Sequence, residues 1–357
     1  MSPDVVSGPR VRASDVTFEV RDTDGRLRGV TLRQELDRTT APAFTKPPSS
    51  DTWRLRYPRA AVDRMEYQLE LRYSRGGADI VIDASNPLTA RGPFGAKSVI
   101  EFPGYRPPAW LDIADGPAGR LHQLAVPSTI LGMEQPVALW SSAGTTADEA
   151  LPLLVAHDGP EYASYSSLVV MLGRLVHAGR LPPMRAALLP PVDRNEHYSA
   201  SPAYARALAT EVLPFLDRIA PSTQSHVGMG ASLGALAMLH AQRTHPATFG
   251  ALFLQSGSFF VRRHDAHESW LKRFDRITRF VERVHAGRGQ PARIPVVMTC
   301  GAGEENLANN RDVGHALAVH GYPVRLHEVR DAHNWVAWRD AFDPHLVDLL
   351  AQMWGRR

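Results

Sequence analysis

Gly230-Ala231-Ser232-Leu233-Gly234 is the stretch that decides the fold of this chain. The residues before it, 225–229, can form a short strand, and Leu233 to His245 shows the apolar spacing of a helix, which Pro246 ends. A serine flanked by small residues fits the tight, strained turn that exposes a serine hydroxyl between a strand and a helix. The pentapeptide therefore predicts a nucleophilic Ser232, and the alternative is a buried serine before a core helix.

The composition indicates a globular protein. The chain has 357 residues, of which 44% are hydrophobic and 22% are charged, so it is long enough for two domains. Its net charge of +3 is small, and no dense basic run interleaves with aromatic residues, so we expect no nucleic-acid partner. The N-terminal residues lack the pattern of a signal peptide, and no segment is apolar enough to span a membrane. We therefore expect a cytoplasmic protein with no membrane partner.

The front part of the chain has the periodicity of an all-β domain. Short alternating segments are separated by Gly, Pro, Asp and Asn, which favours a small β-sandwich over residues 1–112. Residues 86–108 are rich in Pro and Gly, and we expect them to form an extended linker. The predicted strands are 16–20, 30–32, 52–57, 66–73 and 80–83.

From about residue 113, strand-like and helix-like segments alternate. Leu151–Ala156 is a nearly continuous apolar run, as in a strand that is buried on both faces of a sheet. The alternation predicts an α/β domain over 113–357 with a mostly parallel, doubly wound sheet. The predicted strands are 121–126, 137–141, 151–156, 186–189, 225–229, 251–254, 295–299 and 324–329, and the predicted helices are 204–219, 233–245, 310–320 and 346–354.

A serine nucleophile needs a base, and the base needs an orienting carboxylate. In a doubly wound sheet with this type of turn, the acid and then the base follow later strands of the sheet. His333 follows the predicted strand 324–329. The loop after the predicted strand 295–299 carries two adjacent carboxylates, Glu304 and Glu305, and either could serve as the acid.

An oxyanion formed during acyl transfer needs two backbone N–H donors. We expect one to be the amide of Leu233, directly after the nucleophile. The second should come from the loop 157–162, where Pro160 has no N–H, and Gly159, Glu161 or another neighbour remains available. We favour Gly159, because a glycine lets a substrate approach the backbone closely.

The sequence gives little indication of a metal site. The sole cysteine, Cys300, lies in an apolar run, which leaves no disulfide and no cysteine cluster. His264, Asp265 and His267 are close in sequence, but no His-x-x-x-His pattern with an acidic partner accompanies them. We therefore expect neither a metal nor a cofactor.

Motifs spread over nearly the whole chain resemble those of one known family. They are His157–Tyr162, Asp193–Tyr198, Glu211–Pro214, the pentapeptide around Ser232, Gln255–Phe259, His333-Asn334-Trp335 with Trp338-Arg339-Asp340, and, near the front, Met65-Glu66-Tyr67 and Asp83–Pro87. With these motifs the chain resembles the enterochelin (ferric enterobactin) esterase-like family. The resemblance implies an α/β-hydrolase domain over 113–357, preceded by an immunoglobulin-like β-sandwich over 1–112.

The resemblance also implies roles for individual residues. Ser232 becomes the nucleophile and His333 the base, and the Gly-x-x-Glu loop of the family favours Glu304 as the acid. Arg194 would bind anionic or catecholate groups at the edge of the site. The alternative role of Arg194 is to pair with Glu196 or Glu211 and hold a loop.

Two further residues complete the expected substrate site. Trp335 and Trp338 are candidates to line the pocket, and we expect one of the two to pack behind the histidine loop instead. Arg262 lies in a segment that we expect at the mouth of the site, and we assign it to substrate binding.

Members of the family hydrolyse the ester bonds of cyclic trilactone siderophores, usually loaded with iron. The expected partner is therefore a small-molecule ester, and a homodimer is left open. The alternatives are an acyltransferase that uses the same acyl-enzyme, an esterase for other acyl or carbohydrate esters, and a non-catalytic ligand-binding protein. An acceptor-dependent product would indicate the acyltransferase, and failure of a fluorophosphonate to label Ser232 would indicate the binding protein.

Overall fold

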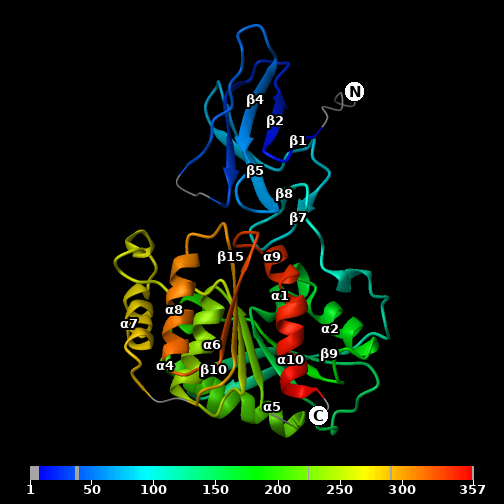
Figure 1. The fold of residues 1–357 in the computed structure, drawn as a ribbon, viewed down its shortest axis with the longest axis vertical. Helices are drawn as coiled ribbons and strands as arrows, with labels where there is room; N and C mark the ends of the chain where they lie inside the picture. Colours follow the sequence, from blue (N-terminus) through cyan, green and yellow to red (C-terminus); the bar gives the residue numbers. More distant parts are fainter. Residues whose placement is uncertain (1–7, 37–39, 224, 290–291, 356–357) are drawn as a thin grey trace. The chain divides into compact units, whose positions relative to one another are not determined.

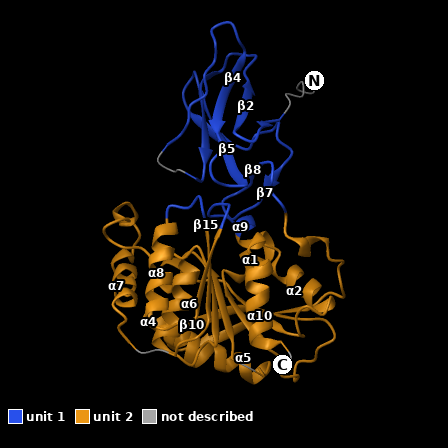
Figure 2. Cartoon of the chain, in the orientation of Figure 1, with its two compact units in different colours: residues 1–106, 301–305, 329–337 blue, residues 107–300, 306–328, 338–357 orange. Residues whose placement is uncertain are grey.

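The structure, a computed structural model, describes residues 8–36, 40–223, 225–289 and 292–355. The chain divides into two units (Figure 2). Unit 1 comprises residues 1–106, 301–305 and 329–337, and unit 2 comprises residues 107–300, 306–328 and 338–357. Unit 1 thus contains two short segments from the C-terminal part of the chain. The predicted division at residue 112 stays a prediction.

Unit 1 contains two antiparallel sheets whose apolar faces enclose one core (Figure 1). Alternation along the strands creates this core: Val16 and Phe18 of one sheet are buried, as are Val30 and Leu32 of the other. The ring of Phe18 meets that of Tyr67 edge-on, with 4.9 Å between their centroids. The strands are β1 (Arg10–Val11), β2 (Asp15–Arg21), β3 (Leu27–Gln34), β4 (Thr52–Pro58), β5 (Arg64–Tyr73), β6 (Ala78–Val81), β7 (Thr89–Ala90) and β8 (Lys97–Glu101).

The prediction that residues 86–108 form an extended linker is wrong. Strand β8 lies within this segment and pairs antiparallel with β5. Its Val99 and Ile100 are buried in the unit. A run of five residues between turn-forming neighbours is too short to indicate a strand from its sequence. The strand is stabilised by its pairing with β5, which the local sequence pattern does not record.

Unit 2 is built on an eight-stranded sheet in the order β16-β15-β14-β13-β11-β12-β10-β9. Strand β12 pairs in parallel with β11, as do β11 with β13, β13 with β14 and β14 with β15. Strand β10 pairs antiparallel with β12 and, through the predicted hairpin, with β9. The mostly parallel sheet expected from the sequence is thus confirmed. The strands are β9 (Arg120–Ser128), β10 (Met133–Ser141), β11 (Leu153–His157), β12 (Arg185–Leu189), β13 (Val227–Ala231), β14 (Ala251–Gln255), β15 (Val296–Gly301) and β16 (Val324–Val329).

Helices cover both faces of this sheet (Figure 1). Helices α6, α7 and α8 lie on one face, and α1, α2 and α10 lie on the other. The helices are α1 (Gly159–Tyr165), α2 (Leu168–His177), α3 (Arg194–His197), α4 (Pro202–Ala207), α5 (Leu213–Ile219), α6 (Leu233–Thr244), α7 (Phe274–His285), α8 (Leu307–Val319), α9 (Trp335–Asp340) and α10 (Val347–Trp354). Of the helices in the described part of the chain, none is both long and apolar enough to cross a membrane.

Helix α6 lies at the centre of unit 2 and carries the pentapeptide at its start. Residues 233–242 of this helix are all buried, so it is apolar nearly all round and packs into the core. The predicted helix 204–219 is divided into α4, a π-helical turn at Leu208–Val212, and α5. Pro214 has no N–H to donate, which accounts for the interruption of the regular hydrogen bonding.

Candidate active site

The pentapeptide forms a sharp turn between β13 and α6. Ser232 has φ 56° and ψ −124°, a backbone conformation that is strained for a residue other than glycine. A Cβ on Gly230 would lie 2.6 Å from the carbonyl carbon of Gly234, and a Cβ on Gly234 would lie 3.2 Å from Oδ2 of Asp158. A side chain at position 230 would therefore collide with the backbone, and one at position 234 would lie tightly against Asp158.

Ser232 is fixed by the last residue of β14 and by the segment that follows this strand. Its N–H donates to the carbonyl oxygen of Gln255 at 2.9 Å, and its own carbonyl accepts from the N–H of Ser258 at 3.1 Å. The hydroxyl oxygens of Ser232 and Ser258 lie 3.0 Å apart. The strained turn is thus held on both sides, and Ser258 supplies a polar neighbour for the predicted nucleophile.

The segment 255–258 is itself locked by buried polar side chains. The indole N–H of Trp338 donates to the hydroxyl of Ser256 at 2.9 Å. Asn310 accepts from the N–H of Gly257 and donates to its carbonyl, both at 2.9 Å. Motif residues 255–259 were recognised in the sequence without a role, and the structure shows that 255–258 brace the turn at Ser232.

His157 stabilises the start of α6 from β11. Burial lowers the pKa of His157 to about 4, so its ring is neutral near pH 7. The Nδ1–H donates to the carbonyl of Gly234, and Nε2 accepts from the hydroxyl of Tyr204, both at 3.0 Å. The ring also stacks on Tyr198 with 4.4 Å between centroids. This histidine is a structural support of the pentapeptide that sequence reasoning did not identify.

The two residues predicted to form the oxyanion hole each begin a helix. Gly159 is the first residue of α1, and Leu233 is the first residue of α6. Backbone N–H groups at helix starts carry partial positive charge and bind anions. A Cβ on Gly159 would lie 2.4 Å from Cα of Leu188, so packing on β12 accounts for this glycine. Their role as oxyanion donors stays a prediction.

In unit 1, the imidazole of His333 meets the carboxylate of Glu304. Nδ1 of His333 lies 2.8 Å from Oε2 of Glu304, and because a carboxylate only accepts, Nδ1 carries the proton. The other oxygen, Oε1, accepts from the N–H of Gly301 at 2.7 Å. The side chain of Glu304 is 1% exposed and that of His333 is 25% exposed, whereas Glu305 is an exposed residue. The pair has the geometry of a carboxylate that orients a histidine base.

Arg194 makes a different ion pair from the one considered in the sequence. It binds Asp158 with two nitrogens, Nε at 3.0 Å and Nη2 at 2.9 Å. The alternative of a pairing with Glu196 or Glu211 is wrong, because Glu196 binds Arg276 and Glu211 binds the turn after β9. Asp158 and Arg194, which belong to two different sequence motifs, therefore form an ion pair with each other.

We expect Arg194→Ala to lower the free energy of unfolding by about 1–3 kcal/mol, because it leaves the buried carboxylate of Asp158 unpaired. The side chain of Asp158 is 6% exposed and that of Arg194 is 40% exposed, so solvent screens part of the effect. Chemical denaturation measures the change. Arg262→Ala is the matched control, since its pair with Asp275 is exposed, and we expect it to stay within about 0.5 kcal/mol of the parent.

The other predicted substrate residues lie in different settings. Arg262 binds Asp275 at 2.7 Å, and its side chain is 56% exposed. Trp335 begins α9 in unit 1, and its ring lies 3.8 Å from the position that a Cβ on Gly92 would take. Trp338 is buried and bound to Ser256, so this second tryptophan packs inside unit 2. Roles for Arg262 and Trp335 in substrate binding stay predictions.

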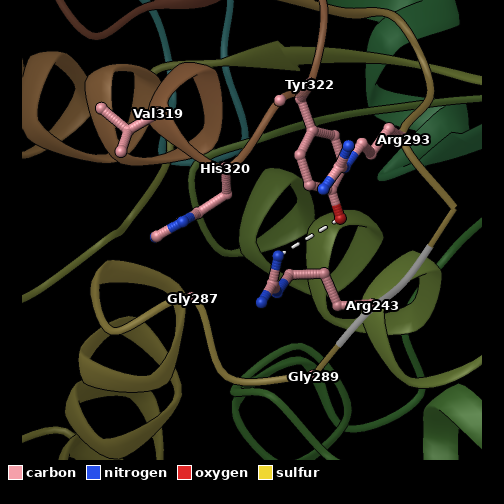
Figure 3. Close-up of a pocket in the computed structure, with 8 residues that line it drawn as sticks. Arg243, Gly287, Gly289, Arg293, Val319, His320 and Tyr322 are labelled. Atoms are coloured by element: carbon pink, nitrogen blue, oxygen red, sulfur yellow. Dashed lines mark hydrogen bonds between the residues drawn. The ribbon is translucent and has the colours of Figure 1, made fainter.

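Unit 2 also has a hollow of about 670 Å³ at the other end of α6 (Figure 3). Arg243, in the last turn of α6, points into it and donates to the hydroxyl of Tyr322 at 3.2 Å. A helix of 12 residues is about 18 Å long, so this hollow is remote from Ser232. Its lining consists of Arg243, Gly287, Gly289, Arg293, Val319, His320, Gly321 and Tyr322.

Comparisons with known proteins give the family and the fold of the chain. The iron(III) enterobactin esterase of Escherichia coli O6:H1 is 26% identical over 289 residues, which cover 78% of this chain and 69% of that protein. The crystal structure of the enterobactin esterase of Shigella flexneri, determined in the presence of enterobactin, has a TM-score of 0.77 at 22% identity and covers 97% of this chain and 96% of its own.

The same fold occurs in a further solved structure. The ferric enterobactin esterase of Salmonella typhimurium has a TM-score of 0.76 at 22% identity, again over 97% of this chain and 96% of its own. The α/β-hydrolase fold and the enterochelin-esterase-like resemblance read from the sequence are thereby confirmed. A family model described as "Putative esterase" matches residues 128–349, which is more than half of the chain and includes the strained serine turn and the histidine–carboxylate pair. The chain belongs to this esterase family.

Proposed function

We propose that this protein is a serine esterase that hydrolyses the ester bonds of a cyclic trilactone siderophore with catecholate groups, through an acyl-enzyme on Ser232. The observation that carries the proposal is the strained turn at Ser232, which places a serine hydroxyl at the start of α6. The relatives described above are esterases of iron(III) enterobactin, which supports this class of substrate.

The proposed reaction begins with attack by Oγ of Ser232 on the ester carbonyl, while Nε2 of His333 takes the hydroxyl proton. Glu304 accepts a hydrogen bond from the Nδ1–H of His333, so Nε2 is the ring nitrogen that takes the proton. When the tetrahedral intermediate collapses, the C–O bond breaks and His333 returns the proton to the leaving alkoxide. Water then hydrolyses the acyl-enzyme by the same proton transfers, giving a free acid and restoring Ser232.

The order of the residues along the chain supports this triad. Ser232 directly follows β13, Glu304 comes three residues after the end of β15, and His333 comes four residues after the end of β16. In doubly wound sheets, reacting groups gather beyond the carboxyl ends of the strands. The amides of Leu233 and Gly159 are the proposed donors to the oxyanion, since both begin helices.

Substrate recognition is proposed to involve the cationic and aromatic residues named from the sequence. Arg194 keeps 40% of its side chain exposed beside Asp158, and a guanidinium can contact anionic or catecholate oxygens. Trp335 and Arg262 are the other proposed contacts. The cytoplasmic location and a homodimer remain predictions from the sequence.

Product analysis by mass spectrometry tests the proposal. The purified chain is incubated with an iron-loaded catecholate trilactone, with its iron-free form, and with a short-chain aryl ester, each beside Ser232→Ala. We expect linear trimer, dimer and monomer acids from the trilactone only with intact Ser232. Cleavage of the aryl ester alone would contradict the substrate while leaving the serine mechanism in place, and an acceptor-dependent ester product would indicate an acyltransferase.

A further inference from the structure

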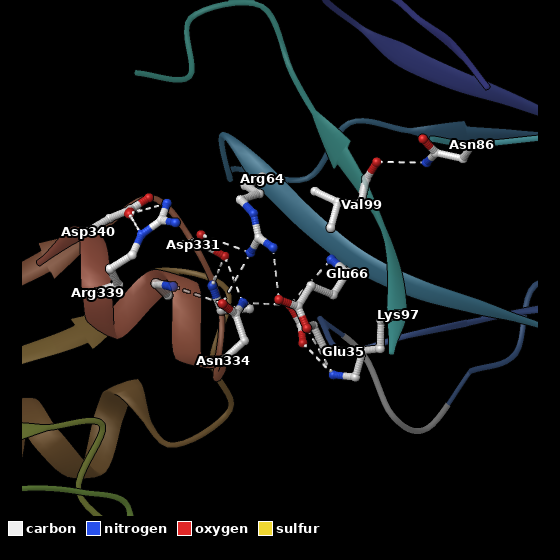
Figure 4. A network of polar contacts seen from close by, with 12 residues as sticks. Glu35, Arg64, Glu66, Asn86, Lys97, Val99, Asp331, Asn334, Arg339 and Asp340 are labelled. Atoms are coloured by element: carbon white, nitrogen blue, oxygen red, sulfur yellow. Dashed lines mark hydrogen bonds and ion pairs between the residues drawn. The ribbon is translucent and has the colours of Figure 1, made fainter. Parts of the chain in front are cut away.

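The segment that carries His333 is bound to the β-sheets of unit 1 by the residues on either side of the histidine. Asp331 and Asn334 are 6% and 4% exposed, and their side chains enter a network of charged groups (Figure 4). The network joins them to residues of β5 and to Glu35, which lie some 270 to 300 positions earlier in the chain. A histidine that is only partly buried is therefore flanked by two anchored neighbours.

Arg64, the first residue of β5, is the centre of this network. It is 2% exposed, and its Nη1 donates to Oδ1 of Asn334 at 3.2 Å and lies 3.8 Å from Oδ2 of Asp331. Its Nη2 donates to Oε1 of Glu66 at 2.9 Å. One guanidinium thus contacts residues on both sides of His333, two positions before it and one after it, using the planar fork that a lysine lacks.

Asn334 extends this network to a further carboxylate, that of Glu35. Its Nδ2 donates to Oε1 of Glu35 at 2.8 Å and to Oδ1 of Asp331 at 3.0 Å. Its Oδ1 also accepts from the N–H of Ala337 at 2.8 Å and so caps the start of α9. Burial raises the pKa of Asp331 to about 7 and, together with Glu66, raises the pKa of Glu35, as expected for groups shielded from water.

The loop that carries Glu304 is tied to the same part of unit 1. The N–H of Gly303 donates to the carbonyl of Asp331 at 3.1 Å, and a Cβ on Gly303 would lie 2.7 Å from a methyl carbon of Leu36. The N–H of Asp63 donates to the carbonyl of Arg330 at 2.7 Å. The N-terminal sheets therefore contact both loops that form the histidine–carboxylate pair.

We infer that Arg64 is a positioning residue for ester hydrolysis: the N-terminal β-sheets serve the reaction by holding, through the contacts of Arg64 with Asp331 and Asn334, the segment that presents His333. This inference rests on the proposed function, in which His333 is the base. A base displaced by about 1 Å can lower turnover by about 100-fold, so an anchor of this kind acts on kcat.

The test compares Arg64→Gln and Arg64→Lys with Tyr67→Phe in the full chain, using a short-chain aryl ester. Tyr67 lies in the same strand and is buried, but its hydroxyl donates to Asp83, so this control perturbs the sheets without touching Asp331 or Asn334. We expect Arg64→Gln to lower kcat by about 10- to 100-fold with KM changed less than about threefold. Arg64→Lys should recover part of the loss, and Tyr67→Phe should keep kcat within about twofold.

A second readout reports the histidine directly. The downfield proton resonance of the Nδ1–H bonded to Glu304 should broaden or disappear in Arg64→Gln and persist in Tyr67→Phe. If Arg64→Gln fails to fold, Asn334→Ser replaces it, because serine keeps an acceptor for the cap of α9 and removes the amide donors. The same loss of kcat is expected.

Two results would overturn the inference. One is a folded Arg64→Gln protein whose kcat stays within about twofold of the parent, and the other is an equal loss in Tyr67→Phe. His333→Ala separates this inference from the proposed function. An inactive His333→Ala beside a fully active Arg64→Gln rejects only the positioning role, whereas an active His333→Ala rejects the proposed base and the inference together.

Discussion

Ser232→Ala is expected to lower kcat for ester hydrolysis by about 10⁴- to 10⁶-fold, because it removes the atom that forms the acyl-enzyme. The strained backbone at this position, with φ 56°, is held by Gln255 and Ser258 through main-chain hydrogen bonds that alanine retains. The variant should therefore fold like the parent. Steady-state kinetics with the aryl ester and with the trilactone measure the loss, and labelling by a fluorophosphonate should disappear in parallel.

Ser258→Ala is the matched control for this substitution. The hydroxyl oxygen of Ser258 lies 3.0 Å from that of Ser232. The control substitution therefore removes the same chemical group from the residue beside the proposed nucleophile. A lost hydrogen bond is worth about 0.5–1.5 kcal/mol, so we expect no more than about a tenfold decrease in kcat. A loss in Ser258→Ala as large as that in Ser232→Ala, or persistent labelling of Ser232→Ala, would contradict the assignment of the nucleophile.

The parts of the fold that could be predicted are those that depend on residues close together in the sequence. The turn at Ser232 needs small neighbours, and Gly230 and Gly234 reveal it, because a Cβ on Gly230 would collide with the backbone and one on Gly234 would lie tightly against Asp158. The parallel strands are revealed by continuous apolar runs such as Leu151–Ala156, most of which forms the buried strand β11. Strand β8 was missed because its existence depends on pairing with β5, a contact that no local pattern records.

The candidate site was only partly predictable for the same reason. The chemistry of the site can be predicted from its residue types. The contacts that hold these residues in place, however, join partners that are far apart in the chain. The alternative to substrate binding for Arg194 is a pairing with Glu196 or Glu211, yet the arginine pairs with Asp158, 36 positions earlier. Arg64 and Asn334 are 270 positions apart, and a single sequence offers no signal that joins them. Hydrogen bonds and ion pairs of this kind follow from the folded arrangement and not from spacing in the sequence.

Glu304→Gln is expected to lower kcat by about 10³- to 10⁴-fold, comparable to the loss of the orienting carboxylate in other serine hydrolases. Glu304 accepts two hydrogen bonds, from the N–H of Gly301 at 2.7 Å and from Nδ1 of His333 at 2.8 Å. Glutamine has one acceptor and one donor at its end. If its oxygen serves Gly301, its amide N–H₂ faces Nδ1, and the imidazole proton must then move to Nε2, the atom that should accept from Ser232.

The alternative orientation of the glutamine is no better for catalysis. With its oxygen on His333, the N–H₂ faces the N–H of Gly301, and two donors are buried against each other. Glu305→Gln is the matched control, one position away and exposed, and we expect it to keep kcat within about twofold. Kinetics and thermal unfolding of both variants decide the matter. A larger loss of kcat in Glu305→Gln than in Glu304→Gln would assign the role of the acid to Glu305. If Glu304→Gln unfolds like the parent but has lost its turnover, the carboxylate of Glu304 is needed for the reaction and not for the fold.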